Sequence, residues 1–274
     1  MRTQAQKGEA FRSLHARKRA FIIPNPWDVG TARMLERIGF EALATTSAGY
    51  AFSSGVLDNQ VGREDMLEHV AEIVAATDLP VSADLENGFG DDPKTVAETI
   101  RLAAAAGVAG GSIEDSIDRP GEKVYELAHA VDRIRAAVEA ARSLPFPFTL
   151  TARAENYLVG IPDLRDTIRR LQAYQEAGAD VLYAPSITSR EDITAVVRAV
   201  DRPVNFLMGT QPQRFSLEEL TQIGVRRVSV GSALSLASLG AFLRAAREMK
   251  ESGTFTYAKD AASFREVSDL LKRS

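Results

Sequence analysis

Short apolar runs alternate with longer amphipathic stretches along the whole chain. Apolar and β-branched runs predict eight strands, at Phe21–Pro24, Ala42–Thr46, Val81–Leu85, Gly110–Glu114, Thr149–Ala152, Val181–Ala184, Val204–Leu207 and Arg227–Val230. Between them, apolar residues at positions i, i+3 and i+4 predict helices, for example over 29–37, 94–106 and 164–177. Several of these helices stop at a glycine, as at Gly39 and Gly224, which is typical of a helix C-terminus.

This alternation predicts a parallel sheet with right-handed helical crossovers. Eight strand–helix units favour a closed (β/α)8 TIM-type barrel, and the whole chain, 1–274, then forms one domain. An open Rossmann-type sheet is the alternative, but no G-x-G-x-x-G pattern follows the first predicted strand. The last stretch, 251–274, reads as a glycine and polar break followed by one more amphipathic helix, a C-terminal extension beyond the eighth unit.

Composition narrows the classes of partner. The chain is 45% hydrophobic and 26% charged, with a net charge of −4, which gives no electrostatic footprint for nucleic acid or an anionic membrane. It contains no cysteine, which excludes disulfides, thiolate metal ligands and a cysteine acid or nucleophile. The N-terminal segment is polar and basic, and no apolar run is long enough to span a bilayer. We therefore expect a cytoplasmic protein with no nucleic-acid or membrane partner.

Acidic residues gather where the predicted strands end, and the active site of such a barrel lies at the C-terminal ends of its strands. Asp84 and Glu86 are two apart on one predicted strand, so both side chains should point to one face. Glu114 and Glu155 end the next two strands along the chain, beside Arg153. Taken singly, such acids are often solvated loop residues. Together they predict a functional cluster.

Carboxylates held together in a barrel mouth repel one another, and a bound divalent cation removes that cost. All-oxygen ligands suit Mg²⁺, or alternatively Mn²⁺, rather than Zn²⁺. The three histidines, His15, His69 and His129, fall in helical patterns and are expected to have surface or packing roles. Gly88 and Gly90 allow a tight turn just past the acids, where a ligand can approach the backbone.

Six motifs, in this order and spacing, resemble the isocitrate lyase / phosphoenolpyruvate mutase superfamily over residues from about 21 to about 249. They are AsnProTrpAspValGlyThrAlaArg (25–33), ThrThrSerAlaGly (45–49), AspLeuGluAsnGlyPheGly (84–90), GlySerIleGluAsp (111–115), ThrAlaArgAlaGlu (151–155) and ArgValSerValGly (227–231). The resemblance implies a barrel whose last helix is commonly exchanged between subunits, giving a homodimer or homotetramer. It also implies Mg²⁺ chelated by an oxalate-like enolate, with bonds made or broken next to a small 2-oxo acid.

The resemblance also implies roles for individual residues. Asp84 resembles the direct Mg²⁺ ligand, with Asp58, Glu86 and Glu114 around it, mainly holding metal-bound water. Arg153 resembles the cation that faces the enolate oxygen, and Arg153, Glu114 and Asp58 form the expected catalytic group. The expected substrate-binding residues are Thr45, Ser47, Ala48, Gly49, Arg153 and Asn205, of which the first four form a loop that holds the substrate carboxylate.

The chain departs from the better-known branches in several places. Glu86 stands where the family usually has aspartate, and no Lys-Lys-Cys-Gly-His motif of the isocitrate and methylisocitrate lyases is present. In the P–C mutases a gating loop with lysine and an Asn-Ser pair follows the fourth strand. Here that loop reads SerIleAspArgProGlyGluLysVal (116–124), in which only Lys123 is similar, and Pro185 replaces the mutase histidine.

These features predict a Mg²⁺-dependent C–C lyase that acts on a small 2-oxo acid or a substituted malate through an enolate, by retro-aldol cleavage, decarboxylation or hydrolysis. A P–C bond mutase or phosphonopyruvate hydrolase is one alternative, and a non-catalytic ligand-binding barrel is another. The physiological substrate and the proton donor are left open, because the loops after the third and fourth strands match no familiar pattern.

Overall fold

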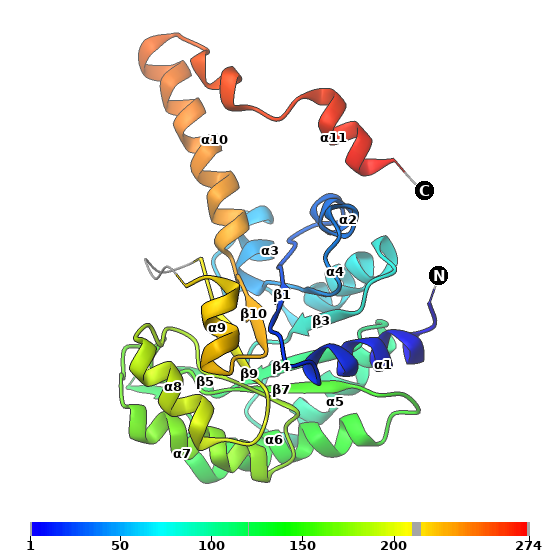
Figure 1. The fold of residues 1–274 in the computed structure, drawn as a ribbon, viewed down its shortest axis with the longest axis vertical. Helices are drawn as coiled ribbons and strands as arrows, with labels where there is room; N and C mark the ends of the chain where they lie inside the picture. Colours follow the sequence, from blue (N-terminus) through cyan, green and yellow to red (C-terminus); the bar gives the residue numbers. More distant parts are fainter. Residues whose placement is uncertain (1, 120, 210–214, 273–274) are drawn as a thin grey trace.

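The computed structural model describes residues 2–119, 121–209 and 215–272, and within these a nearly closed parallel barrel forms the centre of the molecule (Figure 1). The eight strands lie in the order β1-β10-β9-β8-β7-β4-β3-β2, and all neighbours are parallel. They are β1 (Phe21–Ile23), β2 (Leu43–Ala44), β3 (Val81–Asp84), β4 (Gly110–Glu114), β7 (Thr149–Arg153), β8 (Val181–Tyr183), β9 (Val204–Leu207) and β10 (Arg227–Ser229). The predicted TIM-type fold and all eight predicted strands are confirmed.

The strands β1 and β2 stand at the two ends of the strand order, and few hydrogen bonds join them. The N–H of Ala44 donates to the carbonyl of Pro24 at 3.1 Å. Beside it, the side chain of Asn25 links three strand ends: its Nδ2 donates to the carbonyl of Thr45 at 2.9 Å, and its Oδ1 accepts from the N–H groups of Val230 and Gly231 at 2.9 and 3.0 Å. One buried amide therefore holds the seam of the barrel together.

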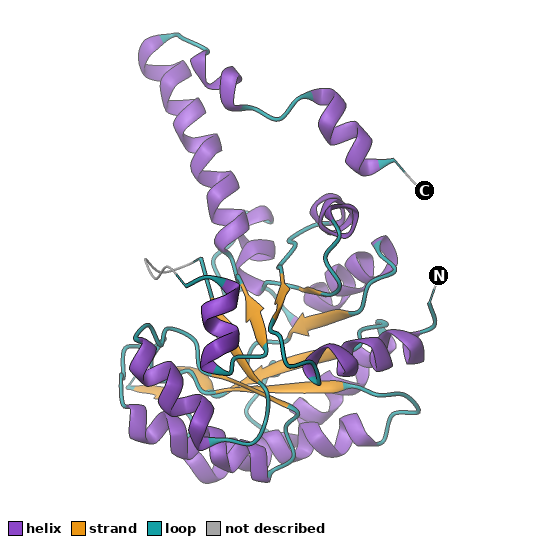
Figure 2. Ribbon diagram, in the orientation of Figure 1, coloured by secondary structure: helices purple, strands orange, loops and turns teal. Residues whose placement is uncertain are grey.

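Helices surround the barrel, as Figure 2 shows in purple around the orange strands. They are α1 (Gln4–His15), α2 (Val29–Ile38), α3 (Ser47–Ser53), α4 (Arg63–Ala76), α5 (Pro93–Ala105), α6 (Leu127–Arg142), α7 (Leu164–Glu176), α8 (Arg190–Ala199) and α9 (Leu217–Ile223). The helix α2 begins at a capping box in which Asp28 accepts from the N–H of Thr31 at 2.7 Å, and it ends at Gly39 with a φ of 104°. These signals are why the sequence predicted its bounds closely.

The apolar core lies between the strands and these helices. Val96, Ile100 and Ala103 of α5 and Ile134 of α6 are fully or almost fully buried in it. Burial of one side chain the size of isoleucine contributes about 1.5–3 kcal/mol. The N-terminal helix α1 adds a smaller cluster that contains Phe11, and it packs so closely that a Cβ on Gly8 would meet the carbonyl oxygen of Pro147 at 2.2 Å.

A two-stranded antiparallel hairpin, β5 (Ser116–Arg119) and β6 (Glu122–Val124), follows β4. No strand was predicted here from the sequence, where residues 116–124 were compared with the gating loop of the P–C mutases. The hairpin lies beside the C-terminal end of the barrel and supplies Ser116 and Ile117 to the pocket described below.

The C-terminal part stands away from the barrel. The helix α10 (Ala233–Ser252) projects outward, and after the helical turn η1 (Thr256–Asp260) the chain returns to α11 (Phe264–Leu271), which lies near α2 (Figure 1). This confirms a further helix beyond the eighth strand–helix unit. Large apolar side chains are exposed along it, including Phe242 at 65%, Phe255 at 65% and Phe264 at 90%. In the described part of the chain, no helix is both long and apolar enough to cross a membrane.

Candidate active site

Two neighbouring pockets open at the C-terminal ends of the barrel strands. The first, which we call the loop pocket, has a volume of 870 Å³ and is lined by loops after β2, β3, β4 and β7. The second, the barrel pocket, has a volume of 280 Å³ and continues between the strands themselves. Both are lined by Ser47, Asp58, Arg153 and Leu158. The acidic cluster expected from the sequence lies around this shared region.

Arg153, the last residue of β7, is the centre of the cluster. Its Nη1 donates to Oδ1 of Asp84 at 3.0 Å, its Nη2 lies 2.9 Å from Oε2 of Glu114, and its Nε donates to Oε1 of Glu155 at 2.7 Å. Burial alone would lower the pKa of Arg153, but the three carboxylates together raise it well above its ordinary value. The guanidinium is therefore charged at every accessible pH, and its orientation is fixed by three partners.

Asp84 ends β3 and lines the barrel pocket, in contact with Ser47 and Arg153, which line both pockets. One of its oxygens contacts Arg153, and the other, Oδ2, accepts from the N–H and the hydroxyl of Ser47 at 3.2 and 3.0 Å. The main chain of Asp84 is held as well, because its N–H donates to Oγ1 of Thr45 at 2.9 Å. The residue expected to bind the metal is thus fixed by both the backbone and the side chain.

Glu86 reaches the cluster by a different route from the one expected. The strand β3 ends at Asp84, and Glu86 lies in the following turn with a φ of 49°, so the two side chains are not brought together by strand alternation. Glu86 is nevertheless buried, and its Oε1 has no hydrogen-bond partner. Burial, and then the charges of Asp84, Glu114 and Asp58, raise the pKa of Glu86 to about 8.

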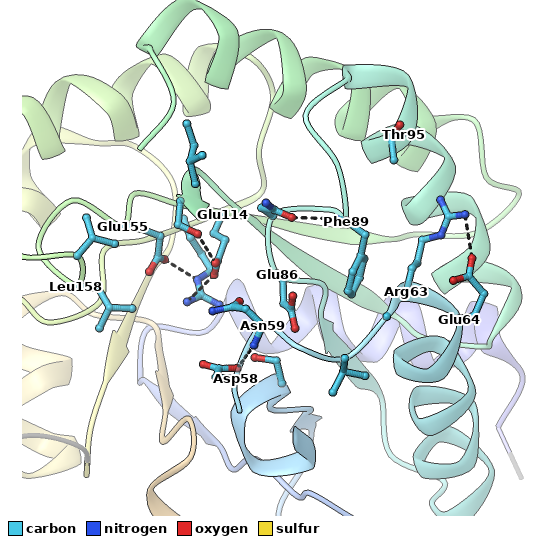
Figure 3. Close-up of a pocket in the computed structure, with 18 residues that line it drawn as sticks. Asp58, Asn59, Arg63, Glu64, Glu86, Phe89, Thr95, Glu114, Glu155 and Leu158 are labelled. Atoms are coloured by element: carbon cyan, nitrogen blue, oxygen red, sulfur yellow. Dashed lines mark hydrogen bonds and ion pairs between the residues drawn. The ribbon is translucent and has the colours of Figure 1, made fainter. Parts of the chain in front are cut away.

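The remaining acids surround the same pocket (Figure 3). Burial raises the pKa of Glu114, which accepts from the hydroxyl of Ser116 at 2.6 Å, and it also raises the pKa of Glu155. Asp58 lies on an exposed loop, but its carboxylate borders both pockets, and desolvation followed by the charge of Asp84 raises its pKa. More carboxyl groups therefore gather here than the single guanidinium of Arg153 can hold in their charged forms, and a second cation would favour those forms.

A second buried network supports Glu155 from behind. Asp115 accepts from the N–H of Glu155 at 2.8 Å and from Nη1 of Arg170 at 3.0 Å, and it also accepts a hydrogen bond from the hydroxyl of Tyr174. All of these groups are buried. The network fixes the backbone at Glu155, two residues after Arg153, and no role was predicted from the sequence for Asp115, Arg170 or Tyr174.

The other expected substrate-binding residues occupy different positions. Thr45, Ser47 and Ala48 line the barrel pocket at the start of α3. Gly49 does not line either pocket: its N–H donates to Oγ1 of Thr46 at 3.2 Å, and a Cβ there would meet Cγ2 of Thr46 at 2.6 Å. Gly49 thus packs closely within the first turn of α3, and its expected role in substrate binding stays a prediction.

Asn205, also expected to bind substrate, lies deeper in the barrel pocket. Its Nδ2 donates to the hydroxyl of Ser229 at 2.9 Å, and its Oδ1 accepts from Nε of Arg227 at 2.8 Å. The three histidines lie in α1, α4 and α6, as expected, and none lines either pocket.

The cluster fits a hard divalent cation. Among the described residues, no three His, Cys, Asp or Glu side chains converge as a ready-made metal cage. Mg²⁺ does not require one, because it is commonly held by one or two carboxylates, water and the substrate. Asp84 in the barrel pocket, the orphaned buried oxygen of Glu86 and the surplus of carboxyl groups all suit such an ion. A thiolate site is excluded by the absence of cysteine.

Comparison with known proteins identifies the family. Residues 11–250 match the phosphoenolpyruvate phosphomutase family model. A 2-methylisocitrate lyase of Shewanella oneidensis is 33% identical over 231 residues, covering 81% of this chain and 77% of that protein. A crystal structure from Burkholderia cenocepacia J2315, assigned in general terms as a lyase or mutase, is 62% identical with a TM-score of 0.96, and the match covers 98% of this chain and 97% of that one.

A crystal structure of oxaloacetate acetylhydrolase in complex with the product oxalate is 26% identical, with a TM-score of 0.86 over 99% of this chain and 95% of that one. The fold, the acidic cluster and these matches agree on one class, the barrel enzymes that include carbon–carbon lyases. The chain belongs to the isocitrate lyase / phosphoenolpyruvate mutase superfamily.

Proposed function

We propose that this protein is a Mg²⁺-dependent carbon–carbon lyase that acts on a small 2-oxo acid or a substituted malate. The observation that carries the proposal is the position of Asp84 in the barrel pocket, between Ser47 and Arg153 and beside the unpartnered oxygen of Glu86. The relatives named as 2-methylisocitrate lyase and oxaloacetate acetylhydrolase support the same reaction class.

Asp84 would hold the ion directly, and Glu86, Glu114 and Asp58 would hold its water ligands. When bound, Mg²⁺ supplies a Lewis acid that polarises the oxygens of a 2-oxo acid. It would also favour the charged forms of Glu86 and Glu114, whose pKa values are now raised by burial and then by the neighbouring carboxylates. Mn²⁺ has similar ligand preferences and is expected to substitute.

Arg153 would stabilise the negative charge that develops on the substrate oxygen when the bond beyond the 2-oxo carbon breaks. Its side chain is already oriented by Glu114 and Glu155, so little reorganisation is needed during the reaction. Thr45, Ser47 and Ala48, at the rim of the barrel pocket, would position the substrate carboxylate. Retro-aldol cleavage, decarboxylation and hydrolysis all share this enolate-forming step.

P–C bond chemistry is less well supported by the hairpin after β4. Its one lysine, Lys123, donates to the backbone carbonyl of Val159 at 2.8 Å and does not line the loop pocket. Pro185, which lines the barrel pocket, offers no side-chain donor to a phosphoryl group. The proposed C–C lyase mechanism requires neither a lysine at 123 nor a side-chain donor at 185.

A screen of 2-oxo acids and substituted malates with Mg²⁺ tests the proposal by following release of pyruvate, glyoxylate or oxalate. We expect turnover of at least one C–C substrate, abolished by Asp84→Ala and by chelation of the metal. Phosphonopyruvate turnover without any C–C cleavage would favour the mutase or hydrolase alternative instead. An inert protein that still binds Mg²⁺ and oxalate would favour a non-catalytic binding barrel.

A further inference from the structure

The interior of the barrel near Asp84 contains a cavity lined by both polar and apolar side chains. Such barrels are ordinarily filled by bulky branched side chains, but several residues that line this pocket are small, among them Ala44, Ser82 and Ser112. Arg227, the first residue of β10, also lines this pocket and is only 5% exposed. A buried cation therefore lines the same pocket as Asp84, the proposed metal ligand.

The guanidinium of Arg227 is only partly satisfied. Its Nε donates to Oδ1 of Asn205 at 2.8 Å, and Asn205 is itself fixed by its bond to Ser229. Within residues 2–119, 121–209 and 215–272, no hydrogen bond joins the Nη1 or Nη2 of Arg227 to another group, and no carboxylate forms an ion pair with it. Five N–H donors are thus present, and one is used.

The surroundings of Arg227 do not neutralise its charge. Burial and the positive charge of Arg153 lower the pKa of Arg227, although Tyr183 partly offsets them, and the pKa comes to about 10. Tyr183 is a neutral phenol near neutral pH, because burial raises its pKa. A buried cation without a counter-ion is costly, whereas a buried cation with a bound anion is a common way to recognise carboxylates.

We propose that Arg227, with Asn205 and Ser229, forms an anion subsite in the barrel pocket beneath the metal site. The ligand is a small monoanionic group presented to the free guanidinium edge. It comes either from the distal carboxylate of the substrate, which rests on the proposed function, or from a free small anion. In the first case the preferred substrate is a 2-oxo acid with a second carboxylate.

Calorimetry with three probes on the full-length protein tests this subsite. Mg²⁺ with oxalate occupies only the metal site, Mg²⁺ with a four-carbon 2-oxo dicarboxylate reaches further, and sodium bromide reports a free anion. In Arg227→Met we expect at least tenfold weaker binding of the dicarboxylate or of bromide, and a change of less than threefold for oxalate. Arg226→Met is the matched control, because the guanidinium of Arg226 donates to the carbonyls of Gly224 and Val225 and does not line the pocket.

A second variant covers the case in which Arg227→Met does not fold. Asn205→Asp keeps the size of the side chain and places a carboxylate against Arg227. The internal carboxylate should compete with the ligand, so binding of the same probe should weaken at least tenfold without loss of folding, as judged by circular dichroism.

The outcomes separate the two sources of the anion. Loss of dicarboxylate binding alone assigns the subsite to the substrate, and loss of bromide binding assigns it to a free anion. Unchanged binding of both probes in Arg227→Met or in folded Asn205→Asp overturns the subsite, as does an equal loss for oxalate. If Mg²⁺ and oxalate fail to bind the unmodified protein, the proposed function fails, while the bromide titration still decides the subsite.

Discussion

The Nη1 of Arg153 lies 3.0 Å from Oδ1 of Asp84, although the two residues end strands that are separated in the barrel by β4. The ion pair crosses the end of β4 and shares its cation with Glu114 and Glu155. Because one guanidinium serves three carboxylates, each acid is held without being fully neutralised. The three acids are thus held in place by Arg153, and a second cation bound among them would stabilise their charged forms further.

We expect Asp84→Ala to abolish activity and Mg²⁺-dependent oxalate binding, because it removes the direct ligand. Glu86→Gln is the matched control: it removes an ionisable carboxyl beside Asp84 while keeping the side-chain shape, and loss of a group around the ligands typically costs about 10–100-fold in metal affinity. Calorimetry with Mg²⁺ and oxalate compares the two variants. Unchanged affinity in Asp84→Ala would show that the metal ligand lies elsewhere.

The free energy of unfolding should decrease as the pH is lowered, because of the buried His69. This side chain stacks on Tyr50 with ring centroids 3.7 Å apart. Burial lowers its pKa from 6.5 to about 4. The unfolded chain therefore binds the proton first, and the stabilising effect is complete above pH 6.5 and is lost as the pH falls from there towards 4. His69 should contribute a loss of about 1 kcal/mol between about pH 7 and about pH 5.5.

Urea unfolding at these two pH values measures this contribution. The variant His69→Phe keeps a flat ring against Tyr50 but does not titrate in this range, so its stability should fall by less than that of the unmodified protein. His15, whose pKa burial also lowers, is present in both proteins, and its effect cancels in the comparison. Equal pH dependence of the two proteins would show that His69 is not buried in its neutral form.

We predict a homo-oligomer held partly by the segment after α10. The exposed apolar side chains of α10 and of the following segment, including Phe242, Phe255 and Phe264, are more than an isolated chain would leave in water. Truncation before Gly253 should therefore give a weaker or monomeric assembly in light scattering. Phe264→Ser should weaken it in the same direction, whereas Lys259→Ser should not. A full-length chain that is monomeric at all concentrations would contradict the prediction.

We also predict no useful cleavage of isocitrate or 2-methylisocitrate, although a 2-methylisocitrate lyase is among the relatives. The lyases that the chain resembles use a cysteine as the acid, and this chain has none. Loss of a positioned proton donor costs about 10² to 10⁴ in rate, so turnover should stay below about 0.1 per second against a typical value of about 10 per second. A coupled glyoxylate or pyruvate assay measures it, and turnover near the typical value would mean that another residue supplies the proton.

The fold was predictable because each barrel strand is an apolar or β-branched run and several helices carry clear end signals, such as Asp28 and Gly39 of α2. The hairpin β5–β6 was not, because its strands are short and mostly polar and their pairing is irregular. The barrel interior was equally hidden, since the small size of Ser82 and Ser112 has a consequence only once the strands are paired.

The acidic cluster could be predicted from strand ends alone, with one correction. The sequence placed Glu86 beside Asp84 by strand alternation, but β3 ends at Asp84. Glu86 itself, with a φ of 49°, lies in the following turn, and this turn brings its carboxylate to the cluster. Arg227 was missed because it begins its strand. Only its long side chain, seen in three dimensions, places its charge in the barrel pocket.

The hydrogen bonds of Asn25 protect backbone amides at the seam of the barrel, where β1 meets its neighbouring strands. The amides of Val230 and Gly231 are protected from exchange with solvent by the side chain of Asn25, and the amide of Ala44 by one carbonyl across the same seam. In hydrogen-exchange terms, these three amides should open together, at a lower free energy than the strands β3 to β9. Asn25 also holds the carbonyl of Thr45, whose hydroxyl accepts from the N–H of Asp84, so an opening of the seam would reach the acidic cluster.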